Sequence, residues 1–255
     1  VHDPAYVELV AREIAKGSRR LSTGDTDVGP QSYEVALVAT GGVLNAVDEV
    51  MEGRLRNAFC AVRPPGHHAT ADRGMGFCIF NHVAVAARHA QRVHGAERVV
   101  IVDWDVHHGN GTQDIFYREG SVFYFSTHQH PWYPGTGLKT ETGAGKGKGT
   151  TLNCPLPEGT MIEVVRDGFR NRFLPMMKRF RPDLVIISAG FDSRHGDPLG
   201  GFRLRDEDFA ELTTLLLDLA SRSCDNRIVS VLEGGYNFSG LGSAAHAHVA
   251  ALAGA

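Results

Sequence analysis

The stretch Arg98-Val99-Val100-Ile101-Val102-Asp103-Trp104-Asp105-Val106-His107-His108 decides the fold of this chain. After Arg98 it continues as the apolar run Val99-Val100-Ile101-Val102, which predicts a strand buried on both faces of a parallel sheet. Because alternate strand residues point to one side, Asp103, Asp105 and His107 should converge where this strand ends. Two carboxylates and an imidazole at this spacing can bind a divalent metal ion or support its ligands. The alternative is a loop whose acids merely cap the next helix.

Five further apolar runs resemble strands, and helical patterns separate them. The expected strands are 58–62, 98–102, 122–126, 150–153, 184–188 and 228–232. The expected helices begin at Pro4 and stop at Gly17, and then cover 31–51, 80–94, 161–180, 205–222 and 241–252. Strands that alternate with helices predict an α/β fold with three α/β/α layers and a mainly parallel sheet. The length of 255 residues suits one domain over 1–255.

Composition narrows the classes of function. The hydrophobic share of 42% and the charged share of 22% are those of an ordinary soluble globular protein. A formal net charge of −3 argues against nucleic acid as the main ligand. The sequence has no apolar run of membrane-spanning length and no signal peptide, so we expect no membrane partner and a cytoplasmic protein. The four cysteines are scattered without CxxC spacing and are expected to be reduced thiols.

Reactive side chains follow several of the predicted strands. In α/β sheets, ligands bind at the carboxyl ends of the strands. Asp192 comes after the strand at 184–188 and can join Asp105 and His107 as a third ligand. Three protein ligands leave one position open for water, as in a catalytic zinc site. Because two carboxylates donate much charge to the metal, its water should be less acidic and a separate base becomes useful.

His67 and His68 could supply that base, and Tyr236 could assist it. Two adjacent imidazoles do not both readily carry a proton, so their pKa values should separate, with one acting as base while the other holds charge. The Tyr236 hydroxyl, presented by a Gly-Gly turn, could donate to the oxyanion of a tetrahedral intermediate. Taken alone, the histidines could be surface loop residues and the tyrosine ring could simply pack.

Six motifs occur in the order found in one known family. They lie at 63–68, 74–78, 103–111, 134–137, 190–198 and 232–237. This pattern resembles the zinc-dependent histone deacetylase and acetylpolyamine amidohydrolase superfamily, which has an arginase-like α/β fold. The match runs over nearly the whole chain. The resemblance implies attack of water on an amide carbonyl, collapse of the tetrahedral intermediate, and release of acetate and amine.

The resemblance also implies roles for individual residues. One Zn²⁺ per chain would be bound by Asp105, His107 and Asp192. His68 would be the general base and then the acid, and His67 its electrostatic partner, oriented by Asp103. Tyr236 would polarise the acetyl carbonyl. The family's structural K⁺, beside the zinc, would be bound by Asp103, Asp105, His107, Ser126 and Thr127.

The walls of a narrow acyl-lysine tunnel would be Phe77 and Tyr133, with Gly76 lining it. Leu199 would occupy the gate position, where polyamine-selective relatives tend to carry glutamate. Because an apolar gate offers no anion to a polyamine's ammonium group, it favours acyl-lysine in a protein or peptide. An acetylated small amine remains the alternative substrate, so acetylpolyamine hydrolysis stays open, and the sequence does not predict the oligomeric state.

Three departures from the family pattern affect this interpretation. The partner of His68 is Asn110, where class I deacetylases have aspartate, so the chain resembles class II and bacterial members and His68 should stay neutral more readily. The family's opening segment, with its first strand, is expected to be absent. The acidic residue that usually contacts the substrate backbone could be either Asp25 or Asp27.

Two other classes of protein compete with a deacetylase. A binuclear manganese ureohydrolase needs further carboxylates that bridge two metals. Phe191 precedes Asp192 and Ser193-Arg194 follow it, so the sequence favours a single metal. A catalytically impaired acyl-lysine-binding protein would have lost Tyr236, a histidine or a zinc ligand, and this chain retains all of them.

Overall fold

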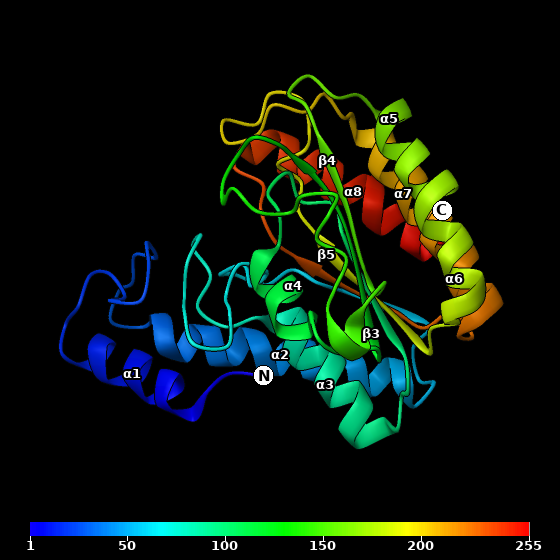
Figure 1. Ribbon diagram of the computed structural model, residues 1–255. Helices are drawn as coiled ribbons and strands as arrows, with labels where there is room; N and C mark the ends of the chain where they lie inside the picture. The colour runs from blue at the N-terminus through cyan, green and yellow to red at the C-terminus, as the bar shows by residue number, and fades with distance from the viewer. Residues whose placement is uncertain (255) are drawn as a thin grey trace.

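A six-stranded parallel sheet forms the centre of the protein, for which a computed structural model describes residues 1–254 (Figure 1). All five pairs of neighbouring strands are parallel, in the order β1-β6-β5-β2-β3-β4. The strands are β1 (Asn57–Cys60), β2 (Val99–Asp103), β3 (Val122–Gln129), β4 (Thr151–Leu156), β5 (Leu184–Ala189) and β6 (Ile228–Leu232). The predicted α/β fold is confirmed.

Helices cover both faces of the sheet, which gives three layers (Figure 1). One face packs against α2 (Ser32–Met51), α3 (His82–His94) and α4 (Asn110–Phe116). The other face packs against α5 (Ile162–Asp167), α6 (Leu174–Phe180), α7 (Asp206–Ser223) and α8 (Phe238–Ala253). The remaining helix, α1 (Pro4–Ala15), contributes with Leu21, Ala36, Ile79 and Phe80 to a smaller third cluster.

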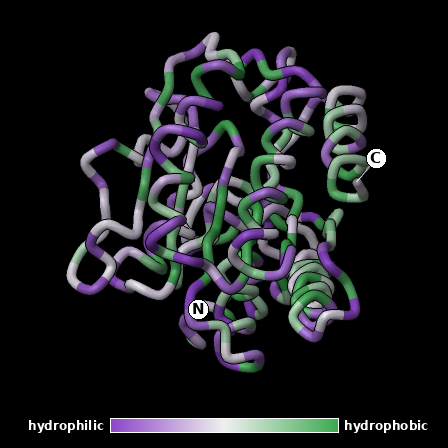
Figure 2. The backbone as a smooth tube through the Cα atoms, turned by 90° about the vertical axis from the view of Figure 1, so that its right-hand side faces the viewer, coloured by the Kyte–Doolittle hydropathy of each residue, from purple (hydrophilic) through white to green (hydrophobic). Residues whose placement is uncertain are grey.

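Strand β2 shows how the sequence produces these layers. Val99 and Ile101 belong to the core under α2 and α3, whereas Val100 and Val102 belong to the core under α5–α8. Because alternate strand residues point to opposite faces, a strand covered on both sides must be apolar at every position. Figure 2 shows the same distribution, with hydrophobic strands in the interior and mostly hydrophilic or neutral outer loops.

One helical prediction needs correction, and one helix was missed. The expected helix at 161–180 consists of α5, a π-helical turn at Gly168–Phe173 and α6. Pro175 explains the interruption. It has no N–H to donate to the carbonyl of Asn171, and in a regular α-helix its ring would clash with that carbonyl. Helix α4 was not predicted, since its seven residues Asn-Gly-Thr-Gln-Asp-Ile-Phe show no helical period.

Residues 1–254 contain no helix that is long and apolar enough to cross a membrane. The four cysteines are buried and free, as expected for reduced thiols. Burial raises the pKa of Cys60 and of Cys224 to about 11, so these thiols stay protonated.

Candidate active site

The predicted metal ligands meet at the carboxyl ends of two neighbouring strands, β2 and β5. His107 Nδ1 lies 3.0 Å from Asp105 Oδ1 and 3.1 Å from Asp192 Oδ2. The three candidate ligand atoms all lie within 4.8 Å of one another, and all three residues are buried. The backbone N–H of Val106 donates to Asp192 Oδ1 at 2.8 Å, and that of Gly234 donates to Asp105 Oδ2 at 2.8 Å. The second carboxylate oxygens are therefore held, and the ligand atoms face one another.

This cluster fits a divalent cation. Burial, together with the charge of Asp105, raises the pKa of Asp192. Burial alone would lower the pKa of His107, but hydrogen bonds to Asp105 and Asp192 and their charges outweigh it and raise the pKa to about 10. Two buried carboxylates thus need a positive charge between them. A bound cation would supply that charge, and imidazole and carboxylate donors suit a zinc-like ion.

Glycine is required where the backbone passes these carboxylates. A Cβ atom on Gly234 would overlap Asp192 Oδ2, and one on Gly190 would overlap Asp105 Oδ2. Both glycines follow strand ends, β6 and β5 respectively. The loops can therefore approach the ligand cluster closely only because they lack side chains at these positions.

The two adjacent histidines lie beside the ligand cluster and have different partners. His67 Nδ1 is 2.9 Å from Asp103 Oδ2, and His68 Nδ1 is 2.8 Å from Asn110 Oδ1. Their ring centroids are 4.1 Å apart. The His68 ring is 6.0 Å from that of His107, and His67 Nε2 is 3.8 Å from Asp105 Oδ2. Both histidines and Asp103 are almost completely buried.

The pKa values of these histidines move in opposite directions. Burial alone would lower the pKa of His67, but the charges of Asp103 and Asp105 outweigh it and raise the pKa well above its ordinary value. Burial, followed by the charges of His67 and His107, lowers the pKa of His68 well below its ordinary value. The separation expected from the sequence is therefore present, with His67 as the cation and His68 as the neutral imidazole.

Aromatic side chains flank this cluster. The ring of Tyr133 lies 5.1 Å from that of His68 and 6.2 Å from that of His107. The half-exposed ring of Phe77 lies 5.8 Å from that of Tyr236. Burial, together with the charges of Asp192 and Asp105, raises the pKa of Tyr236. Its hydroxyl thus remains protonated and available as a hydrogen-bond donor.

The structure distinguishes the two acidic residues that the sequence left as alternatives. Asp25 accepts hydrogen bonds from the Tyr133 hydroxyl at 3.0 Å and from the Gly76 N–H at 2.8 Å, so it joins two predicted tunnel residues. Asp27 instead pairs with Arg20 at 2.7 Å on the surface. Of the two acids, Asp25 is therefore the one that contacts predicted tunnel residues.

Three other predicted residues are placed less directly. The Leu199 carbonyl accepts a hydrogen bond of 2.9 Å from Trp132 Nε1, which puts Leu199 beside the loop that carries Tyr133. Ser126 pairs with Asp103 in the β2–β3 register, and its hydroxyl lies 2.9 Å from His128 Nδ1. The side chain of Thr127 is turned to the other face of the sheet, toward Gly168.

Two buried carboxylates that support the site were not predicted. Glu233 Oε2 accepts from the N–H groups of Gly66 (2.6 Å) and His67 (3.1 Å), and so it holds the turn that carries the histidines. Asp197 Oδ2 accepts from the N–H of Tyr236 at 2.7 Å. The available signal was position, because Glu233 directly follows the apolar strand β6 and an acid there is buried.

The fold and these donors define an α/β protein with a candidate metal-binding site at the carboxyl ends of its parallel strands. The family described as "Histone deacetylase domain" matches residues 1–252. Because that match covers nearly the whole chain, the protein belongs to the histone deacetylase family.

Individual relatives agree with this assignment. The chain is 41% identical over 253 residues to "Histone deacetylase 14, chloroplastic" of Arabidopsis thaliana, covering 95% of this chain and 60% of the relative. It is 40% identical over 238 residues to "Histone deacetylase-like amidohydrolase" of Pseudomonas aeruginosa, covering 93% and 62%. The solved structure "Crystal Structure of HDA15 HD domain" superposes with a TM-score of 0.94 at 40% identity, over 100% of this chain and 71% of that one. The chain thus spans about three fifths of the length of these two relatives.

Proposed function

We propose that this protein is a zinc-dependent amidohydrolase that removes acetyl or other acyl groups from lysine side chains of proteins or peptides. The observation that carries the proposal is the meeting of a buried Asp105–His107–Asp192 cluster with two histidines of opposite pKa shift. The first would supply a metal site, and the second would supply a neutral base beside it. Membership of the histone deacetylase family supports amide hydrolysis as the reaction.

Asp105, His107 and Asp192 would hold one Zn²⁺. When bound, Zn²⁺ would polarise the acyl carbonyl and lower the pKa of water at the site. Next to it, His68 would take the proton from the attacking water, because its lowered pKa keeps it neutral at ordinary pH. His68 would then give this proton to the departing lysine amine. Asn110 orients the His68 ring without adding a negative charge.

His67 would control the charge of the proposed base, and Tyr236 would stabilise the charge that develops on the substrate. His67 carries a positive charge, held by Asp103, and it restrains His68 from becoming a second cation. The protonated Tyr236 hydroxyl would donate a hydrogen bond to the acyl oxygen as negative charge develops there. Each role requires only the protonation state that the surroundings of the residue favour.

The aromatic rings would receive the lysine stem. Phe77 and Tyr133 would flank an apolar acyl-lysine chain, with Gly76 between them and the apolar Leu199 at the gate. This apolar lining favours acyl-lysine over an acetylpolyamine, whose additional ammonium group would lose its hydration there. The substrate would be an acylated protein or peptide, and the alternative is a small acylated amine with a neutral stem.

A structural K⁺ is part of the same proposal. Asp103, Asp105 and His107 end strand β2 and the loop after it, and Ser126 is the register partner of Asp103 on β3. Thr127 would contribute through its backbone, since its side chain is turned toward Gly168. A cation here would offset part of the negative charge of the two buried aspartates.

The test is turnover of an acetyl-lysine peptide by zinc-loaded protein, measured as released acetate. An acetylpolyamine is assayed in parallel as the competing substrate. Tyr236→Phe removes only the hydroxyl and should lower kcat by about 10²–10³-fold, as expected for a lost oxyanion donor. Tyr117→Phe is the matched control, because that ring lies at the end of α4 and outside the site.

Each outcome has a distinct meaning. Peptide turnover that a hydroxamate chelator abolishes supports the proposal. Preferential hydrolysis of the acetylpolyamine would refute the proposed substrate class. Peptide binding without acetate release by both the unchanged protein and Tyr236→Phe would refute the proposal of an enzyme.

A further inference from the structure

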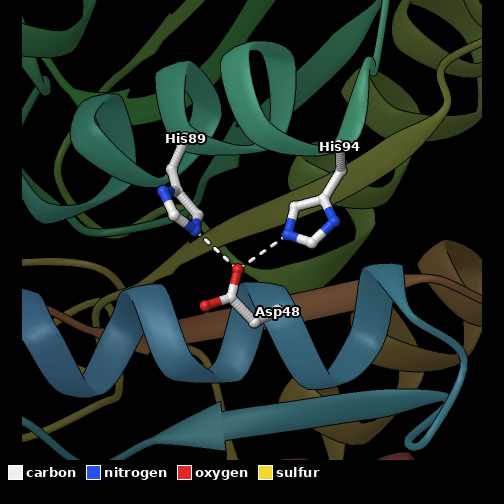
Figure 3. A group of neighbouring side chains, drawn as sticks. All are labelled: Asp48, His89 and His94. Carbon is white, nitrogen blue, oxygen red and sulfur yellow. Dashed lines mark hydrogen bonds and ion pairs between the residues drawn. The ribbon is translucent and has the colours of Figure 1, made fainter.

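A second group of possible metal ligands joins α2 to α3. Figure 3 shows Asp48 of α2 facing His89 and His94 of α3, whose rings both point toward the same carboxylate. Asp48 Oδ1 lies 2.6 Å from His89 Nε2 and 2.6 Å from His94 Nε2. The ring centroids of the two histidines are 5.7 Å apart. Three potential donors thus converge on one point between two helices.

This cluster lies near the amino ends of the strands, whereas the candidate active site lies at their carboxyl ends. His94 is the last residue of α3, and the chain then enters the amino end of β2 at Val99. The active-site acids follow the carboxyl end of the same strand. The length of β2 therefore separates the two clusters, and no residue belongs to both.

The local backbone fixes the position of His94. Gly95 caps α3 with a φ of 70°, a left-handed conformation that glycine adopts without strain, and it ends the helix directly after His94. His89 and His94 are five residues apart, so their side chains leave the helix in different directions and approach Asp48 from two sides. Both Nε2 atoms therefore reach the Asp48 carboxylate although the two histidines do not lie on the same ridge of the helix.

The geometry is close to that of a zinc site. The ligand atoms all lie within 4.8 Å of one another. Tetrahedral zinc with bonds of 2.0–2.1 Å holds its donors about 3.3 Å apart. Each Nε2–Oδ1 distance would need to open by roughly 0.7 Å from 2.6 Å to admit the ion. Small rotations of these partly buried side chains would provide such a movement.

The donor types select the class of ion. Two imidazoles and one carboxylate suit Zn²⁺ and similar transition metals, whereas Ca²⁺ and Mg²⁺ prefer oxygen ligands. The side chains of Asp48, His89 and His94 are 32%, 21% and 11% exposed, so water can reach the site and fill a fourth position. We propose that Asp48, His89 and His94 bind a second Zn²⁺, which fastens α2 to α3. The ion would take no part in the proposed reaction, because the length of β2 separates it from the candidate active site.

The test is the zinc content of protein that has been stripped of metal and then dialysed against a buffer with low free zinc. His94→Gln should lower the content by one ion per chain relative to the unchanged protein. His246→Gln is the matched control, since His246 is an exposed histidine of α8 outside both clusters, and it should leave the content unchanged. The expected difference of one ion holds whether or not the active site is loaded, so it does not depend on the proposed function.

Asp48→Asn separates a metal site from a pair of hydrogen bonds. The amide oxygen can still accept from both imidazoles but has no charge, so zinc should bind at least tenfold more weakly, while the melting temperature of the metal-free protein should stay unchanged. Zinc should raise the melting temperature of the unchanged protein more than that of Asp48→Asn. Equal zinc content in the unchanged protein and His94→Gln would overturn the proposal. If His94→Gln does not fold, equal zinc affinity of the unchanged protein and Asp48→Asn would overturn it.

Discussion

Replacing Asn110 by aspartate tests the electrostatic account of the base. Asn110 Oδ1 accepts from His68 Nδ1 at 2.8 Å and contributes no charge. Burial and the charges of His67 and His107 hold the pKa of His68 below its ordinary value. The proposed base is therefore neutral, and the acid limb of kcat/KM should lie below the ordinary histidine range.

A carboxylate at position 110 would stabilise the imidazolium form of His68. Two unit charges about 4 Å apart interact by ~4 kcal/mol at an effective dielectric constant of about 20, which corresponds to roughly three pKa units. Residue 110 is half-buried, so water screens part of this interaction, and the pKa of His68 should rise by about one to two units. Since a raised pKa protonates the base at higher pH, the acid limb of kcat/KM should move upward by the same amount.

The assay is kcat/KM for an acetyl-lysine peptide from about pH 5 to about pH 9, with zinc-loaded Asn110→Asp and the unchanged protein. Asn45→Asp introduces the same charge on the exposed face of α2 and should leave the acid limb in place. An acid limb that stays fixed in Asn110→Asp, or moves to lower pH, would show that His68 is not the base that titrates.

Three further predictions concern the metal site, a buried acid and the core. Gly234→Ala places a methyl group against Asp192 and should weaken zinc binding by about 10–100-fold in chelator competition, whereas Gly242→Ala faces open space and should not. Burial raises the pKa of Glu233 to about 7. The folded protein therefore loses stability as the pH rises from the pKa of this carboxyl group in the unfolded chain toward 7. In metal-free protein, Glu233→Gln should remove up to about 3 kcal/mol of that loss, measured by urea unfolding at several pH values, and an unchanged pH slope would contradict this. Phe125→Ala removes a ring stacked in the core and should cost about 3–5 kcal/mol by urea unfolding, so a cost below about 1 kcal/mol would contradict the packing.

The fold could be predicted where apolar runs were complete. Strand β2 was predicted within one residue at each end, because every position of it is buried. Strand β3 continues to Gln129, beyond the predicted end at residue 126. Polar residues such as His128 hid this extension, since their side chains are satisfied by contacts that only the folded chain provides.

The site was predictable where a residue type is demanded by its chemistry. Asp105, His107 and Asp192 were recognised from their positions after strands, and the structure brings them together. Glu233 was not, because its task is to accept hydrogen bonds from the backbone of a loop that lies 166 residues earlier in the chain. Such a contact has no local sequence period and becomes visible only in three dimensions.

The order of the strands has a consequence for how the protein matures during synthesis. Strands β2 and β5 are neighbours in the sheet, but β3, β4 and the segment up to α6 lie between them in the chain. A ribosome therefore releases His107 long before Asp192, and β6 follows later still. Because the parallel pairing between β2 and β5 must wait for the segment that carries β5, the candidate metal-ligand cluster can form only after Asp192 has been synthesised. Metal loading at this cluster should consequently follow the release of β5 and not begin when His107 leaves the ribosome.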